Sequence, residues 1–541
     1  MEIKDNTTFQ SSLPKRQVVI AMGGTMLSMF LGSLYMTIVA TAMPTIITDL
    51  GGFRQYSWVF TSFFVAEIIA IPLTGKLSDM YGRKWFYVTG LTIFVVGSFL
   101  CGISQTMTQL IVFRGLQGLG FGVMTSLSFI VIGDLFPPEE RGKYNGLMAG
   151  VLAVSTIIGP TVGGYLTDYL SWRWCFFINI PIGIIIIFLF IFFYPQYRAS
   201  YAKHKVDYAG AVLMILAIVP LMLALTWGGV NYGWLSPIIL GMFGFSVLMF
   251  ILFFLIESRT EEAIMPLGLF RNRVVLVSSI AVLLMGFVFL PAVTFVPLYF
   301  QGVLGTSATL SGNFLAPMML SSAIGAIICG QVLSRTSGYY RLQGTIGFIM
   351  LAVGLFLLSK MTVETSYATA VGNIVLTGFG SGLLMPLHVL AVQNSVPYSV
   401  MGVATAVVTW LRTVGGLFGL AIVGSIMNNR FSSEFMGKLS SEVQAIVSPE
   451  RLASIVDNPQ ALVNVEAQAQ LRSLFEGLGT QGVALYEQML STLRNALNSA
   501  LAEIFAALLI VSVLALVVNF FLKGIPSYQR IKDEQVTEPE D

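Results

Sequence analysis

The stretch GKLSDMYGRK, residues 75–84, is a short charged connector between two long apolar runs. Gly75 and Gly82 permit a close turn, because glycine adopts backbone conformations that other residues avoid. The charged residues of the connector are Asp79, Arg83 and Lys84. Their ion pairs can form in one state of a protein and separate in another, which predicts a charged latch. The alternative is a simple anchor that holds basic residues on the inner side of a membrane.

The composition around this connector is that of a membrane protein. Of the 541 residues, 55% are hydrophobic and only 10% are charged, well below the charge content of a soluble domain. Runs of about 20 apolar residues recur along the chain, and each is long enough to cross a bilayer as a helix. The runs do not alternate in polarity, which excludes a membrane β-barrel. No cleaved signal peptide and no nucleic-acid partner are expected.

We predict an all-α, multi-pass protein with about fourteen membrane helices, a count good to about one. About 19 of the 29 Lys and Arg residues fall on one side if the N-terminus lies inside, and about 8 fall outside. This bias places both termini in the cytoplasm. The expected helix centres lie near residues 30, 65, 95, 120, 155, 185, 217, 246, 285, 322, 352, 380, 414 and 512.

A weak internal sequence similarity indicates that the chain has two related halves. GQVLSRTSGYYR, residues 330–341, follows the tenth expected helix in the position that GKLSDMYGRK holds after the second. Such repeats are typical of secondary transporters. The seventh and eighth helices would lie between the halves.

Several motifs resemble those of the major facilitator superfamily, and GKLSDMYGRK is similar to its signature loop. RGLQGLGFG, residues 114–122, resembles the fourth-helix motif of the antiporters, in which the matching arginine, Arg114, is linked to proton coupling. GPTVGGYL resembles the fifth-helix antiporter motif and includes Gly159, Pro160, Gly163 and Gly164. Further stretches resemble the fourteen-helix drug:proton antiporter branch, namely residues 172–183, 297–312 and 401–416.

The resemblance implies a major facilitator fold of two six-helix bundles plus two extra transmembrane helices. The expected parts are a cytoplasmic N-terminus (1–16), a first bundle (17–195), a cytoplasmic linker with the extra helices (196–273), a second bundle (274–523) and a cytoplasmic tail (524–541). Within the second bundle, residues 428–499 have amphipathic helical patterning and are expected to form an extracellular helical insertion. It is either a loop at the membrane surface or a gating or partner-binding element.

Glu67 is a lone acid near the middle of the run SWVFTSFFVAEIIAIPLTG, residues 57–75. An acid at that depth costs about 2.5 to 3.5 kcal/mol on insertion scales, which usually marks a function or a partner. We expect protonated Glu67 to be stable there, because burial disfavours the charged form. A cationic substrate would favour the ionised form, and Arg114 would tune the acid. The alternative is a protonated acid that serves helix packing only.

The first expected helix departs from the antiporter branch, whose members usually carry an aspartate in LDxTIVxxAxP. Here the stretch is LYMTIVATAMP, residues 34–44, and Tyr35 occupies the acid's place. A phenol can hydrogen-bond a substrate but does not ordinarily release its proton near neutral pH. Glu67 is therefore the candidate for a relocated proton site.

Three more polar residues are candidates for the transport path. Arg412 either lines the substrate cavity or bonds backbone carbonyls. His388 either helps to pass protons, since imidazole titrates near neutral pH, or is a structural histidine. Asp134, in IGDLFPPEERGK, is expected to be an exposed gate or capping acid near Arg141 that takes part in proton coupling. The glycines of the fifth-helix motif are expected to pack helices and to govern how the halves rock.

The predicted function is proton-driven export of amphiphilic, often cationic compounds through a bacterial plasma membrane. The energy source would be the proton gradient, without a cofactor, and the protein would work in the lipid bilayer, with a monomer as the simplest state. Cys101, Cys175 and Cys329 have no metal-ligand spacing and are expected to be inert. Rival functions are a dedicated exporter of one metabolite, lipid or antibiotic, and a non-transporting sensor or scaffold. A membrane enzyme is the weakest rival, since no catalytic set or phosphate loop is found.

Overall fold

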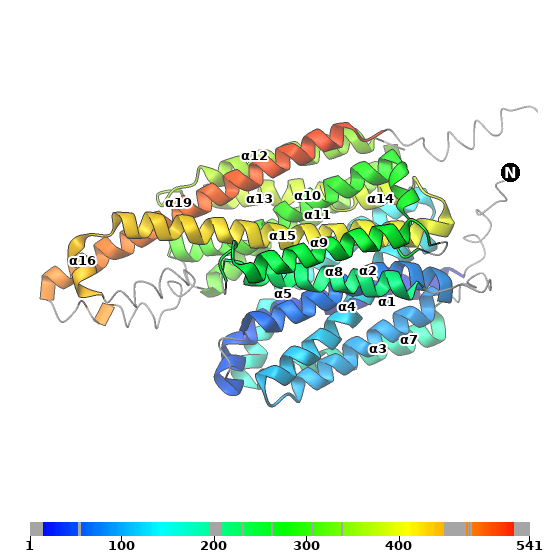
Figure 1. Ribbon diagram of the computed structural model, residues 1–541, viewed down its shortest axis with the longest axis horizontal. Helices are drawn as coiled ribbons and strands as arrows, with labels where there is room; N and C mark the ends of the chain where they lie inside the picture. Colours follow the sequence, from blue (N-terminus) through cyan, green and yellow to red (C-terminus); the bar gives the residue numbers. More distant parts are fainter. Residues whose placement is uncertain are drawn as a thin grey trace, which may run out of the picture.

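The computed structural model describes residues 14–51, 56–194, 207–229, 232–260, 263–305, 308–336, 339–447, 472–473, 475 and 479–523. Several predicted parts lie outside these residues, among them the basic stretch RASYAKHK with His204, most of the N-terminus, the tail from residue 524 and the middle of the predicted insertion. The rest of the chain is helical, as its apolar runs predict (Figure 1).

The first half of the chain forms one group of helices. These are α1 (Lys15–Leu50), α2 (Tyr56–Tyr81), α3 (Arg83–Gly102), α4 (Met107–Leu135), α5 (Pro138–Tyr169), α6 (Trp174–Phe177) and α7 (Asn179–Phe193). The second half forms another group of α10 (Arg273–Leu298), the π-helical turn η5 (Tyr299–Val303), α11 (Ala308–Thr336), α12 (Tyr340–Ser359), α13 (Tyr367–Leu384), α14 (Leu387–Gln393), α15 (Tyr398–Lys438), α16 (Ser441–Ile446) and α19 (Gly479–Phe520). Between them lie α8 (Tyr208–Trp227), α9 (Pro237–Glu257) and the 3₁₀ turn η4 (Leu267–Arg271).

The described residues contain 14 segments long and apolar enough to cross a membrane, which confirms the predicted helix number. Two of these spans are broken. The sixth joins α6 and α7, and the twelfth joins α13 to α14 across Met385 and Pro386. Backbone breaks at membrane depth are tolerated where protein covers them.

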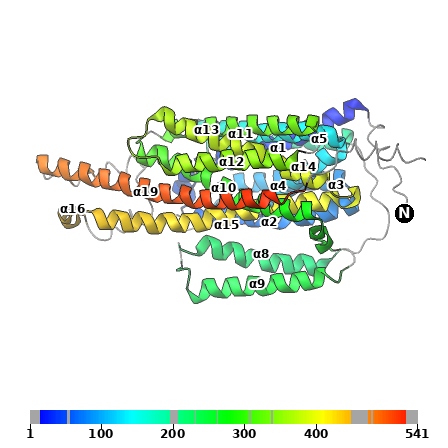
Figure 2. The same cartoon turned by 90° about the horizontal axis from the view of Figure 1, so that it is seen from above.

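The two extra helices lie apart from both bundles. Figure 2 shows α8 and α9 as a pair along one side of the molecule. They pack mainly against each other, and α8 also contacts α2 and α15. The fold is therefore two six-helix bundles plus a helix pair, although the sequence boundaries predicted for these parts stay predictions.

The two bundles are joined most closely at the end of the molecule that carries Gly82, here called the loop end. There α5 crosses α11 so tightly that a Cβ on Gly142 would overlap the carbonyl of Gly330, and a Cβ on Gly146 would lie 2.7 Å from the carbonyl of Ala326. The repeat Gly142, Gly146, Gly150 on α5 is the small-residue spacing that lets membrane helices approach. The loop end is therefore closed in this structure.

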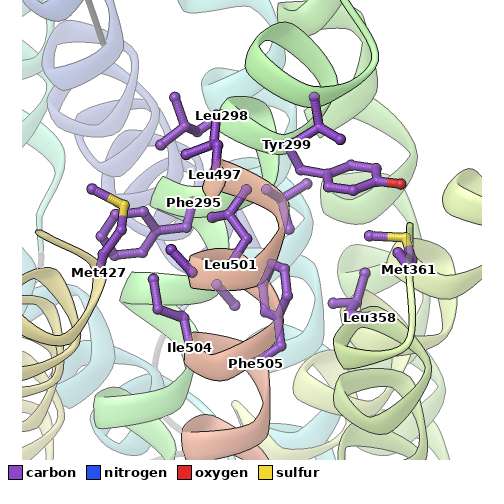
Figure 3. Packing of buried hydrophobic residues seen from close by; sticks show 14 of the residues in the cluster. Phe295, Leu298, Tyr299, Leu358, Met361, Met427, Leu497, Leu501, Ile504 and Phe505 are labelled. Carbon is purple, nitrogen blue, oxygen red and sulfur yellow. The ribbon is translucent and has the colours of Figure 1, made fainter. Parts of the chain in front are cut away.

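At the opposite end, α15 and α19 extend beyond the other helices and carry α16 (Figures 1 and 2). Their inner faces continue the apolar core of the second bundle, in which Met427 and Leu497 pack near Phe295 and Phe505 (Figure 3). The described ends of the predicted insertion are helical, in line with its amphipathic patterning, and the form of the rest stays a prediction. Its described ends are continuations of two spans, because a helix does not stop where its sequence becomes polar if its partner helix keeps one face covered.

We predict that Gly142→Ala opens the loop end. The added methyl group meets the α11 backbone, which cannot rotate away, and such overpacking costs about 1 to 3 kcal/mol. Electron–electron distance measurement between spin labels at Tyr81 and Tyr339, both exposed at the loop end, should show a larger long-distance population. Gly150→Ala is the control, because the nearest atom to its new Cβ lies at an ordinary 3.7 Å. Equal distance distributions for the two variants would contradict a tight crossing at Gly142.

Candidate transport site

Helices α2 and α4 lie side by side with a constant offset that sets the depths of the buried charges. Arg114 donates to the carbonyl of Val59 and Ser126 donates to that of Ile71, both with a separation of 55 residues. Gly122 lies against the backbone of Glu67 in the same register. At a rise of about 1.5 Å per residue, Arg114 lies about 12 Å from the level of Glu67, toward the end opposite the loop end.

The layer at the loop end is centred on the buried Arg83. Its Nε donates to Asp134 Oδ2 at 2.8 Å, its Nη1 donates to Ser78 Oγ at 2.7 Å, and its Nη2 pairs with Asp79. One guanidinium therefore joins α2, α3 and α4, which is geometry that a lysine could not supply. Gly82 makes the junction possible, since its φ of 93° favours glycine.

This layer also contacts the second bundle. Asp79 lies against Gly402 of α15, where a Cβ would overlap the carboxylate. Gly75 lies on the same helix face, and a Cβ there would lie 2.5 Å from that of Ala406. The predicted latch residues thus do lie together, except for Lys84, whose Nζ lies 5.9 Å from the centre of the Trp85 ring instead.

Asp134 corrects one expectation. It is predicted to be exposed, but it is only 4% exposed and pairs with Arg83, while the expected neighbour Arg141 bonds the adjacent carbonyl of Gly133. The register of α4 against α2 places Asp134 beside Asp79. The sequence of α4 alone does not reveal this register.

Arg141 is a functional candidate that the sequence reasoning missed. It is buried and donates to the carbonyls of Gly133 (2.9 Å) and Phe136 (3.1 Å) at the end of α4. It also donates to the Gln393 carbonyl (3.3 Å) and to Asn394 Oδ1 (3.1 Å), at the end of α14. A cation at the C-terminal ends of two helices is favourable, because both ends carry partial negative charge. In sequence, Arg141 resembles any basic residue of an inner loop.

The middle layer contains Glu67 of α2 and Arg412 of α15. Glu67 is 5% exposed, and Arg412 is the basic group that acts on it electrostatically. Gly75 of α2 contacts α15, and these two helices run in opposite directions. Glu67 and Arg412 each lie about two turns further from the loop end than this contact, so the two residues lie at the same level. No ion pair within 4 Å joins the two residues in the part of the chain that the structure describes. An acid of one bundle and a base of the other thus lie at the same level of the molecule.

Arg412 bonds no backbone carbonyl of the residues that the structure describes. No hydrogen bond or ion pair to a described residue holds its side chain, and its guanidinium lies 5.3 Å from the centre of the Phe129 ring of α4. It keeps some exposed surface although it lies in mid-span. The side chain therefore extends between the bundles.

The third layer contains Arg114 and Tyr35. Arg114 Nη1 donates to the Tyr35 hydroxyl at 2.8 Å, and its guanidinium lies 4.3 Å from the centre of the Phe63 ring. Tyr35 is completely buried, packed edge-on against Phe94 and Phe176. The tyrosine that replaces the expected acid thus bonds the motif arginine, while Glu67 lies in a different layer and does not contact Arg114. Tyr35 has no exposed surface in this structure.

The remaining predicted residues lie in packed surroundings, with the exception of Gly164. His388 is fully buried against Phe348, and neither ring nitrogen has a hydrogen-bond partner among the described residues. On α5, Cβ atoms on Gly159 and Gly163 would press on α1 at Thr37 and Ile38, within the first bundle. Pro160 lies inside α5, and Gly164 faces open space.

We predict that Arg83→Gln destabilises the protein by about 3 to 5 kcal/mol, because a buried and a partly buried carboxylate lose their shared cation. Thermal unfolding in detergent measures the loss. Lys84→Gln removes the neighbouring charge but leaves the ion pairs of Arg83 with Asp79 and Asp134 intact. This variant should unfold at the wild-type temperature. If the two variants are equally stable, Arg83 does not hold the loop end together.

We also predict that Tyr35→Phe costs about 1.5 to 3 kcal/mol, since the hydroxyl accepts from a buried charged donor. Tyr87→Phe is the matched control in the same bundle. Its hydroxyl bonds neutral side chains, among them Ser28 and Ser128, and its loss should cost about 0.5 to 1.5 kcal/mol. Chemical unfolding of the two variants compares them, and a larger loss for Tyr87→Phe would refute the special role of Tyr35.

Comparison with known proteins agrees with this architecture. The family model for the Major Facilitator Superfamily matches residues 25–420. The chain is 36% identical over 527 residues to "Multidrug transporter protein MdtP" of Bacillus subtilis, covering 97% of this chain and 96% of that protein. It is 36% identical over 518 residues to "Multidrug resistance protein 3" of the same organism, covering 96% and 97%.

A solved structure with this fold is that of the proton:xylose symporter XylE, with a TM-score of 0.60 at 12% identity over 96% of this chain and 100% of that one. This likeness concerns the fold alone. Together with the fourteen spans, the matches establish that this multi-pass membrane protein belongs to the Major Facilitator Superfamily, among relatives that are multidrug transporters.

Proposed function

We propose that the protein exports amphiphilic compounds, cationic ones among them, in exchange for protons, and that Glu67 carries the exchanged proton. The observation that carries the proposal is the position of Glu67. It is buried in mid-span, on the face of α2 that meets α15, with one basic residue of the opposite bundle acting on it. The multidrug relatives support drug efflux as the activity.

The exchange follows from the energetics of a buried acid. With the proton bound, Glu67 is neutral and stable at low dielectric. When the proton leaves, a cationic substrate can replace it as the partner of the carboxylate, so the two ligands compete for one site. A proton entering down a potential supplies about 2.3 kcal/mol per 100 mV for export.

The closed loop end supplies the second element of the mechanism, a gate. The contact of Asp79 with Gly402, the hydrogen bond of Arg141 to Gln393 and the Gly142 crossing all join the bundles at that end. Export requires these contacts to separate and re-form, and occupancy of Glu67 would bias that equilibrium. We place this end in the cytoplasm of a bacterium, with both termini inside, on the strength of the basic residues. Neither a cofactor nor an oligomer is required by this scheme.

Broad substrate range is supported by composition. The chain contains 25 Met and 40 Phe residues, and such side chains adapt to varied shapes and attract cations through ring faces. A panel of structurally unrelated drugs distinguishes this function from export of a single compound. A non-transporting sensor would show no pH-driven flux in vesicles that contain this protein alone.

We predict that Glu67→Gln abolishes pH-driven uptake of a cationic drug in inverted vesicles, because an amide cannot exchange a proton. Binding of the drug to the purified variant should lose its dependence on pH. Glu503→Gln is the control, an acid that is 50% exposed and far from the site. Uptake by Glu67→Gln with an unaltered pH profile would reduce Glu67 to a packing role.

A further inference from the structure

The guanidinium of Arg412 has binding capacity that the fold does not use. It carries five N–H donors, and no described residue accepts a hydrogen bond from any of them. The other mid-span arginine in this region, Arg114, is bonded to Tyr35, Val59 and Gln117. A buried charge without hydrogen bonds is costly, so an unbonded guanidinium that keeps exposed surface is a group awaiting a ligand.

The surroundings of Arg412 suit a ligand with an apolar body. Phe129 lies beneath the guanidinium, and Val408 and Val414 of the same helix belong to the apolar cluster that joins α2, α8 and α15. Glu67 is the acid that acts on Arg412, from the opposite bundle. The centre of the molecule therefore presents one acidic and one basic group, on different bundles, without a direct ion pair between them.

We propose that Arg412 is the binding site for the anionic group of zwitterionic amphiphiles, compounds that carry a carboxylate and an ammonium on one apolar body. The carboxylate would bind the guanidinium fork, and the ammonium would bind ionised Glu67. This inference rests on the proposed function, because it adds a second contact to the site at which Glu67 exchanges its proton.

The zwitterion is favoured over a simple anion by the direction of coupling. A lone anion binds Arg412 best when Glu67 is protonated, so anion and proton would bind together, which is the coupling of a symporter. A zwitterion needs ionised Glu67 for its ammonium, so it displaces the proton, as exchange requires. A bound zwitterion also gives both Glu67 and Arg412 a partner of opposite charge.

A matched pair of dyes tests the inference, namely a cationic rhodamine methyl ester and the free acid of the same dye, which is a zwitterion. In proteoliposomes with a pH gradient, wild type should transport both dyes. Arg412→Gln should lower transport of the acid at least about tenfold, the loss expected for a charge-assisted pair of about 1.4 kcal/mol or more, and should lower that of the ester much less. Arg412→Lys should fall between, because it keeps the charge but loses the fork.

Three results would overturn the inference. The first is equal loss of both dyes in Arg412→Gln, and the second is transport of the ester but not of the acid by wild type; both leave the exchange at Glu67 standing. The third is no pH-driven movement of either dye by wild type, which counts against the proposed function as well. If Arg412→Gln does not fold, Arg412→Lys decides: dye binding to the purified protein should weaken for the acid alone, and an unchanged preference for the acid would contradict the site.

Discussion

The shared ion pair of Arg83 with Asp79 and Asp134 is the interaction on which the rest of the structure depends. Arg83 and Asp134 are buried within a membrane protein and Asp79 is partly buried, so each charge would be costly alone. Because they come from α2, α3 and α4, their neutralisation fixes the three helices relative to one another. Because Asp79 also lies against α15 at Gly402, the same network brings the second bundle into place.

This closure explains why a mid-membrane carboxylate can exist in the chain. With the loop end closed, α2 and α15 run together from Gly75 toward Glu67 and Arg412, so the acid and the base of different bundles reach the same depth. Separation of the bundles changes the partner of each charge. In the proposed exchange, the proton state of Glu67 and the state of the gate would be linked through this one helix pair, which is the physical requirement for coupling.

Much of the fold could be predicted from the sequence, because the apolar length of each run specifies a span and GKLSDMYGRK marks a junction. What lay beyond reach were contacts between helices far apart in the chain. The burial of Asp134 depends on the register of α4 against α2, and the role of Arg141 depends on the end of α14, which lies in the other bundle. The close crossing at Gly142 and Gly330 was signalled by its glycine spacing, but nothing in either helix alone identifies its partner. For Arg412 the sequence allowed either a cavity-lining role or bonds to backbone carbonyls. Only the absence of carbonyl partners among the described residues distinguishes the two.

The central claim is that Glu67 gives up a proton when substrate binds. The most direct measurement is proton release from the purified transporter in weakly buffered solution as a cationic drug is added. The account predicts release by wild type and by Glu503→Gln, and drug binding without release by Glu67→Gln. Equal proton release by wild type and Glu67→Gln would show that the exchanged proton resides elsewhere.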